Sequence, residues 1–157
     1  MHLVNTVTNT FESDTTIIEM AKQILQGRMK VLDVTFNSSQ SVKDFLSLDL
    51  AAEEREVFAV LFLNTQNKLI EYRRMFFGSV KSVDVYPREI IRAAMTLNAS
   101  AFILSHNHPS GYSEPSEEDR RVTALIEKVA AMLELKLLDH IVVGNGTTVS
   151  FAERGWL

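Results

Sequence analysis

The run Ala99-Ser100-Ala101-Phe102-Ile103-Leu104 leads within two residues to the pair His106-Asn107-His108, which is followed by Pro109-Ser110-Gly111. The apolar run is typical of a strand that is buried on both faces of a sheet. Open α/β sheets place their ligand sites in the loops at the carboxyl ends of strands. We therefore predict a strand over 99–104 and a functional loop that begins with the two histidines.

The sequence on either side of this strand alternates between strand and helix patterns. Val57 to Leu63 is apolar at every position, which predicts a central strand, and Leu69 to Phe77 is predicted to pair back on it as a hairpin. Pro87 opens one helix at its first turn, and Ser116 can cap another. The last two strands are predicted over 135–143 and 147–151. This order predicts an α/β fold with one mixed sheet and helices on its faces.

The N-terminal residues 1–40 are predicted to form a helical segment ahead of a domain that spans 41–157. Ser13 and Asp14 can cap a helix, and Gly27 is predicted to end it. The apolar side chains of this helix recur at helical spacing, at Ile17, Ala21, Ile24 and Leu25.

Composition narrows the function classes. The 157 residues carry a net charge of -4, and each half of the chain holds 8 basic and 10 acidic residues. The lack of a basic cluster argues against direct nucleic-acid binding. Cysteine is absent, which excludes disulfides and thiolate metal sites and fits a cytoplasmic protein. The N-terminus lacks a signal-peptide pattern and the apolar runs are short, so we expect no membrane segment.

Three residues are candidate ligands for one metal ion. His106 and His108 alternate along an extended chain, so both side chains can point the same way. Asp119 lies one helical turn after Ser116, at the start of the predicted helix. Two imidazoles and one carboxylate leave the fourth position of a tetrahedral zinc ion open for water, which is typical of a catalytic site.

Such a water needs a general base, and an oxyanion needs a hydrogen-bond donor. Glu56 is the best candidate base because it immediately precedes the central strand, whereas Glu53 and Glu54 lie further out. The hydroxyl of Ser116 can stabilise the oxyanion of a tetrahedral intermediate.

Simpler interpretations exist for these residues. Ser116 to Asp119 can be a helix cap with an acidic first turn. Glu56 can be a solvated surface charge. His140, which follows Leu138-Asp139, is interpreted as a strand histidine with satisfied hydrogen bonds rather than as a fourth ligand.

The spacing of His106, His108, Ser116 and Asp119 is similar to the JAMM motif of MPN-type metalloenzymes. The wider stretch 106–116 resembles the RadC family. So do three further segments in the family's order, namely Pro87-Arg88-Glu89, Leu138-Asp139-His140 and Ser150-Phe151-Ala152-Glu153-Arg154-Gly155. The resemblance runs from about Val42 to the C-terminus, over a RadC-like JAMM/MPN metallo-domain.

The resemblance implies a three-layer α/β/α fold of the cytidine-deaminase type with a bound Zn²⁺. It implies that His106, His108 and Asp119 are the ligands, that Glu56 is the base and that Ser116 stabilises the oxyanion. Longer RadC proteins carry an N-terminal helix-hairpin-helix region that binds DNA, and the residues before Val42 are too few to hold one.

Two functions follow as hypotheses. The first is a zinc metalloprotease or isopeptidase, in which a metal-activated water hydrolyses the amide bond of a peptide or protein substrate. The alternative is a non-catalytic zinc-binding interaction module that is associated with DNA repair or mobile elements. A deaminase is disfavoured, because zinc deaminases use cysteine ligands. The sequence leaves the substrate and the oligomeric state open.

Overall fold

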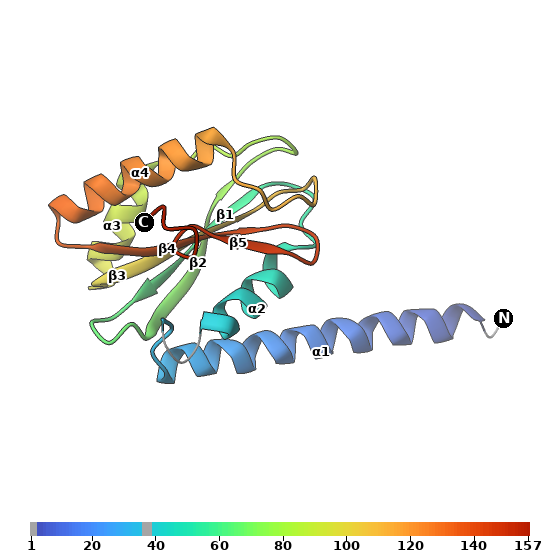
Figure 1. Ribbon diagram of the computed structural model, residues 1–157. Coiled ribbons are helices and arrows are strands. Elements are labelled where there is room, and N and C mark those ends of the chain that lie inside the picture. Colours follow the sequence, from blue (N-terminus) through green and yellow to red (C-terminus); the bar gives the residue numbers. More distant parts are fainter. Residues whose placement is uncertain (1–2, 36–38) are drawn as a thin grey trace.

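The computed structural model describes residues 3–35 and 39–157, with side chains from Ser13 onward. One sheet in the order β2-β1-β3-β4-β5 lies between helices on both faces (Figure 1). The strands are β1 Val57–Leu63, β2 Leu69–Phe77, β3 Ala101–Asn107, β4 Lys136–Val143 and β5 Thr148–Ser150. The helices are α1 Leu3–Val31, α2 Ser39–Leu50, α3 Pro87–Thr96 and α4 Glu117–Met132. The predicted α/β class is confirmed.

The sheet is mixed, as predicted. β1 pairs antiparallel with β2 on one side and with β3 on the other, β3 pairs parallel with β4, and β5 returns antiparallel on β4. The β1–β2 hairpin turns at Asn64, whose side-chain oxygen accepts hydrogen bonds from the backbone N–H groups of Gln66 and Lys68. β1 and β3 are therefore central strands, and both carry an unbroken buried sequence.

Two separate apolar cores explain why β1 and β3 are hydrophobic at successive positions. Alternate side chains of a strand point to opposite faces. Leu61 and Ile103 pack with α1 and α2 on one face, whereas Phe62 and Leu104 pack with α3 and α4 on the other. The sheet is thus the middle of three layers, as expected from the resemblance.

Helix α1 is longer than predicted at both ends. It begins at Leu3, so Ser13 and Asp14 are exposed residues inside the helix rather than its cap. It also continues through Gly27, although glycine inside a helix costs about 1 kcal/mol relative to alanine. The fully buried Met29, which packs against the α2 face of the sheet, lies beyond this glycine. Tertiary burial therefore overrides the local stop signal.

The C-terminal end of one strand also differs from the prediction. β3 extends through His106 to Asn107, because this segment is hydrogen-bonded to β1 on one side and to β4 on the other. The buried face of α4 consists of Thr123, Ile126 and Ala130. Leu125 and Leu133 are also apolar, but they are 51% and 48% exposed.

In the described part of the chain, none of the helices combines the length and the hydrophobicity that a membrane crossing requires.

Candidate metal centre

His106 is held inside the sheet. It is the penultimate residue of β3, opposite Phe58 of β1 and Val142 of β4, and it is fully buried. Because β3 is paired on both sides, the backbone that carries this ring has little freedom.

His108 follows directly after the strand and is fixed by two backbone groups. Its N–H donates to the carbonyl of Val143 at 2.9 Å. Its ring Nδ1 lies 2.8 Å from the carbonyl oxygen of Tyr112. Since a carbonyl can only accept, Nδ1 carries the hydrogen and Nε2 presents a lone pair.

Asp119 approaches from the first turn of α4. Its Oδ2 accepts from the Ser116 N–H at 2.7 Å, and its own N–H donates to the Ser116 hydroxyl oxygen at 3.1 Å. The interpretation of this segment as a helix cap is therefore confirmed, because the two residues form a capping box. The same geometry turns the Asp119 carboxylate toward the histidines.

The three predicted ligands converge on one point. Nε2 of His106 and Nε2 of His108 are 3.0 Å apart, and each lies 3.3 Å from a different carboxylate oxygen of Asp119. Their ligand atoms all fall within 4.8 Å of one another, so the cluster could hold a metal ion. Nitrogen and carboxylate donors of this kind suit a divalent transition metal.

The ionisation of the three candidate ligands favours a positive charge at the centre of the cluster. Burial alone would raise the pKa of the Asp119 carboxyl, yet its contacts with His106 and His108 hold that pKa far below its usual value. The contact with Asp119 raises the pKa of His108, against the effect of burial. Burial lowers the pKa of His106. An ionised carboxylate and two imidazole rings are thus gathered where a cation would satisfy all three, so the residues fit a metal.

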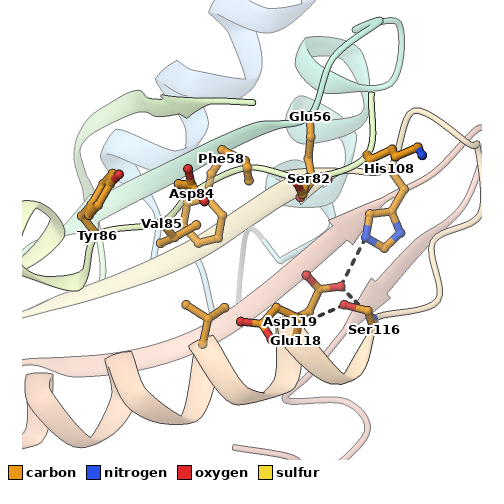
Figure 2. A pocket seen from close by; sticks show the side chains of 13 residues that line it. Glu56, Phe58, Ser82, Asp84, Val85, Tyr86, His108, Ser116, Glu118 and Asp119 are labelled. Carbon is orange, nitrogen blue, oxygen red and sulfur yellow. Dashed lines mark hydrogen bonds and ion pairs between the residues drawn. The ribbon is translucent and has the colours of Figure 1, made fainter. Parts of the chain in front are cut away.

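The cluster borders a cleft of about 670 Å³ (Figure 2). Glu56, Ser116, His108 and Asp119 all line this cleft, and the segment 81–86 forms another part of its wall. The structure therefore brings the predicted base and the predicted oxyanion donor to the same cleft as two of the candidate ligands.

Glu56 lies at the entrance of β1 and is only 8% exposed. Burial raises the pKa of Glu56 to about 7, and the negative charge of Asp119 acts in the same direction, whereas His108 lowers it. The simpler interpretation as a solvated charge is wrong for this residue. Glu54 is exposed, and Glu53 pairs with Arg74 at 2.8 Å.

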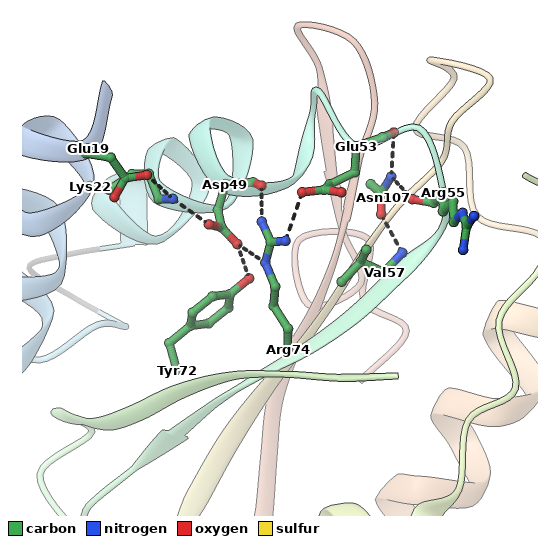
Figure 3. Close-up of polar contacts among 9 residues, drawn as sticks. All are labelled: Glu19, Lys22, Asp49, Glu53, Arg55, Val57, Tyr72, Arg74 and Asn107. Carbon is green, nitrogen blue, oxygen red and sulfur yellow. Dashed lines mark hydrogen bonds and ion pairs between the residues drawn. The ribbon is translucent and has the colours of Figure 1, made fainter. Parts of the chain in front are cut away.

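Asn107 has a structural role that was not predicted from the sequence. Its side-chain oxygen accepts from the Val57 N–H at 2.8 Å, and its amide nitrogen donates to the Arg55 carbonyl at 2.9 Å (Figure 3). Asn107 thus ties the strand that carries His106 to the backbone on both sides of Glu56. On an extended strand, the side chain between the two histidines points away from them, and this alternation was the available sign that Asn107 has a different role. The segment that it contacts, however, lies 50 residues away in sequence.

His140 is a buried strand residue with hydrogen bonds to both ring nitrogens, which agrees with the sequence interpretation. The hydrogen-bond partners of His140 were not predicted from the sequence. They are the ring of His106 and the hydroxyl of Thr123 on α4.

With this fold and this cluster in place, comparison with known proteins identifies the family. A family model described as the RadC-like JAB domain matches residues 36–156, and the chain belongs to this family. The resemblance stated from the sequence is confirmed.

Two curated relatives support the assignment. A UPF0758 protein of Cellvibrio japonicus is 46% identical over 141 residues, which cover 90% of this chain and 62% of the relative. A UPF0758 protein of Methylibium petroleiphilum is 47% identical over 141 residues, which cover 90% of this chain and 63% of the relative. The chain thus spans less than two thirds of the length of either protein.

Proposed function

We propose that this protein is a zinc-dependent hydrolase of amide bonds, acting in the cytoplasm on a peptide or isopeptide linkage. The observation that carries the proposal is the convergence of His106, His108 and Asp119 beside a cleft that Glu56 also lines. Three protein ligands leave coordination positions for water and substrate, as in catalytic zinc sites. The bound ion would polarise a carbonyl group and lower the pKa of water.

Glu56 is the proposed proton carrier. Its carboxyl group is buried at the cleft, and burial raises its pKa to about 7. A general base works best when its pKa lies near the operating pH. A cation at the neighbouring cluster would lower this pKa and favour the ionised form. Glu56 would take a proton from the attacking water and deliver it to the leaving amine.

Ser116 is the proposed oxyanion donor. Its oxygen accepts the Asp119 N–H at 3.1 Å, which leaves the hydroxyl hydrogen free to donate. Because Ser116 lines the cleft, this hydrogen can reach an oxygen that gains negative charge during the reaction. Capping and catalysis are therefore compatible roles of one side chain.

A matched pair of variants tests the proposal. The zinc-loaded protein is incubated with a library of peptides and isopeptide-linked peptides, and cleavage is measured by mass spectrometry. Glu56→Gln should retain the metal and lose roughly 100-fold or more of the activity. Glu54→Gln removes a neighbouring but exposed carboxylate and should cleave normally.

The same experiment has outcomes that contradict the proposal. Full activity of Glu56→Gln would exclude its role as the base. A tightly bound metal without cleavage of any substrate would favour a non-catalytic zinc-binding interaction module.

A further inference from the structure

A buried chain of hydrogen bonds runs behind the candidate ligand His106, on the side away from the cluster. Nδ1 of His106 lies 2.8 Å from Nε2 of His140, and Nδ1 of His140 lies 2.6 Å from the hydroxyl oxygen of Thr123. The Thr123 hydroxyl is also 2.5 Å from the carbonyl oxygen of Asp119. His106, His140 and Thr123 are each at most 1% exposed, so water does not complete these contacts.

The direction of this chain is set at its Thr123 end. The Asp119 carbonyl oxygen has no hydrogen, so the 2.5 Å contact requires the Thr123 hydroxyl to donate to it. A hydroxyl has one hydrogen and then can only accept at its other contact. Nδ1 of His140, at 2.6 Å, must therefore carry a hydrogen and donate to Thr123.

The donor and acceptor nitrogens of His140 determine those of His106 in turn. No carboxylate contacts the ring of His140 among the described residues, and burial without a counter-ion strongly disfavours its charged form. A neutral His140 with the hydrogen on Nδ1 has an accepting Nε2. Nδ1 of His106 must then donate, and Nε2 of His106 is left with its lone pair facing Asp119 and His108.

We propose that His140 and Thr123 are positioning residues, which lock His106 in the tautomer that offers Nε2 to the metal ion. Metal-binding histidines commonly donate their second N–H to a carboxylate, a backbone carbonyl or water. Here the carbonyl is reached through two side chains, and it belongs to Asp119, which is itself a candidate ligand. One hydrogen-bond chain thereby links two of the three ligands. This inference rests on the metal site of the proposed function.

Nuclear magnetic resonance of the metal-free full chain tests the tautomers directly. Long-range ¹H–¹⁵N correlation of ¹⁵N-histidine-labelled protein, at mildly alkaline pH, reports which ring nitrogen carries the hydrogen. His106 and His140 should both carry it on Nδ1, whereas free histidine favours Nε2. A His106 ring with its hydrogen on Nε2 would overturn the inference, whether or not the protein binds metal.

Metal affinity of matched variants provides the second test, with zinc as the probe in competition with a chromogenic chelator. Thr123→Val removes the hydroxyl at nearly constant volume and should weaken zinc binding by about 10-fold. Thr123→Ser keeps the hydroxyl and should restore affinity. Thr96→Val is the control, because Thr96 makes the same bond to the carbonyl four residues back, at 2.9 Å on α3.

The two tests separate the possible failures. Absence of zinc binding in the unaltered protein would refute the proposed function, and the tautomer measurement would still decide the inference. Zinc binding by folded Thr123→Val that equals that of the unaltered protein would refute the positioning role while leaving the metal site in place.

Discussion

Asn107 and Val57 form the contact that joins the two halves of the candidate site. The side-chain oxygen of Asn107 accepts the Val57 N–H at 2.8 Å, so β3 and the start of β1 are locked together (Figure 3). His106 and His108 flank Asn107 in sequence, and Glu56 immediately precedes Val57. Asn107, the residue between the histidines, therefore fixes the position of the proposed base relative to the candidate ligands.

Replacement of Asn107 by Ala should impair both stability and activity. It leaves the Val57 N–H and the Arg55 carbonyl without their partner, at a cost of roughly 2 kcal/mol. A displaced Glu56 should lower the cleavage rate by about 100-fold. Urea denaturation and peptide cleavage measure the two effects.

The control for this variant lies at the far end of β1. Asn64→Ala also removes a side-chain oxygen that accepts backbone N–H groups, in the β1–β2 turn. It should lower the free energy of unfolding and leave the cleavage rate of the folded protein unchanged. Equal rates for the Asn107 and Asn64 variants would show that Asn107 does not position Glu56.

Substitution of Ser116 can separate capping from catalysis. Glycine is a tolerable helix cap, so Ser116→Gly should cost only a few tenths of a kcal/mol of stability, whereas Ser116→Ala should cost about 1 kcal/mol. Both variants lose the hydroxyl and should lose roughly 100-fold in kcat. Thermal unfolding and steady-state kinetics give the comparison. If kcat fell only in Ser116→Ala, in parallel with its loss of stability, Ser116 would act as a helix cap alone.

Acid should destabilise the protein through Asp49. This buried carboxylate accepts hydrogen bonds from Arg74 at 2.9 Å and Tyr72 at 2.6 Å, and it pairs with Lys22 of α1 at 2.8 Å (Figure 3). Burial opposes ionisation, but these partners hold the pKa of Asp49 below its usual value. Its stabilising effect is therefore complete above the unfolded-state pKa of about 3.9 and is lost as pH falls through the folded-state value.

Unfolding free energies of two variants across the acid range check the role of Asp49. Asp49→Asn should be less stable at neutral pH and should lose less stability on acidification. Arg74→Met should cost about 3 kcal/mol at neutral pH, because it leaves Asp49 buried with fewer partners. An unchanged acid dependence in Asp49→Asn would mean that other groups dominate it.

Metal removal should lower the melting temperature. A ligand that binds only the folded state stabilises it by about 2.7 kcal/mol when its free concentration is 100 times Kd. For a chain of this size that corresponds to roughly 5–10 °C. Asp119→Asn should melt at one temperature with or without zinc. The measurement is differential scanning calorimetry with and without chelator, and an unshifted transition of the unaltered protein would contradict a folded-state metal site.

Local patterns predicted the strands and the clustering of the three candidate ligands. The apolar runs of β1 and β3 are typical of strands that are buried on both faces. The spacing from His106 to Asp119 puts the end of such a strand and the start of a helix close together in the sequence. The resemblance to the RadC family predicted the same three residues. The roles of Glu56 and Ser116 remain predictions that the proposed experiments address.

The parts that were missed depend on contacts between distant segments. Gly27 carries a stop signal, yet α1 continues because Met29 is buried against the sheet. The hydrogen-bond partners of Asn107 and His140 lie 50 and 34 residues away in sequence. Neither hydrophobic periodicity nor motif spacing contains such information.

The most direct test of the metal site is anomalous X-ray scattering from a crystal of the zinc-loaded protein, recorded on both sides of the zinc absorption edge. We predict one zinc peak within bonding distance of His106 Nε2, His108 Nε2 and the Asp119 carboxylate, and no peak there in crystals of His106→Ala. A zinc-loaded crystal with no peak at this cluster, or with an undiminished peak in His106→Ala, would contradict the account.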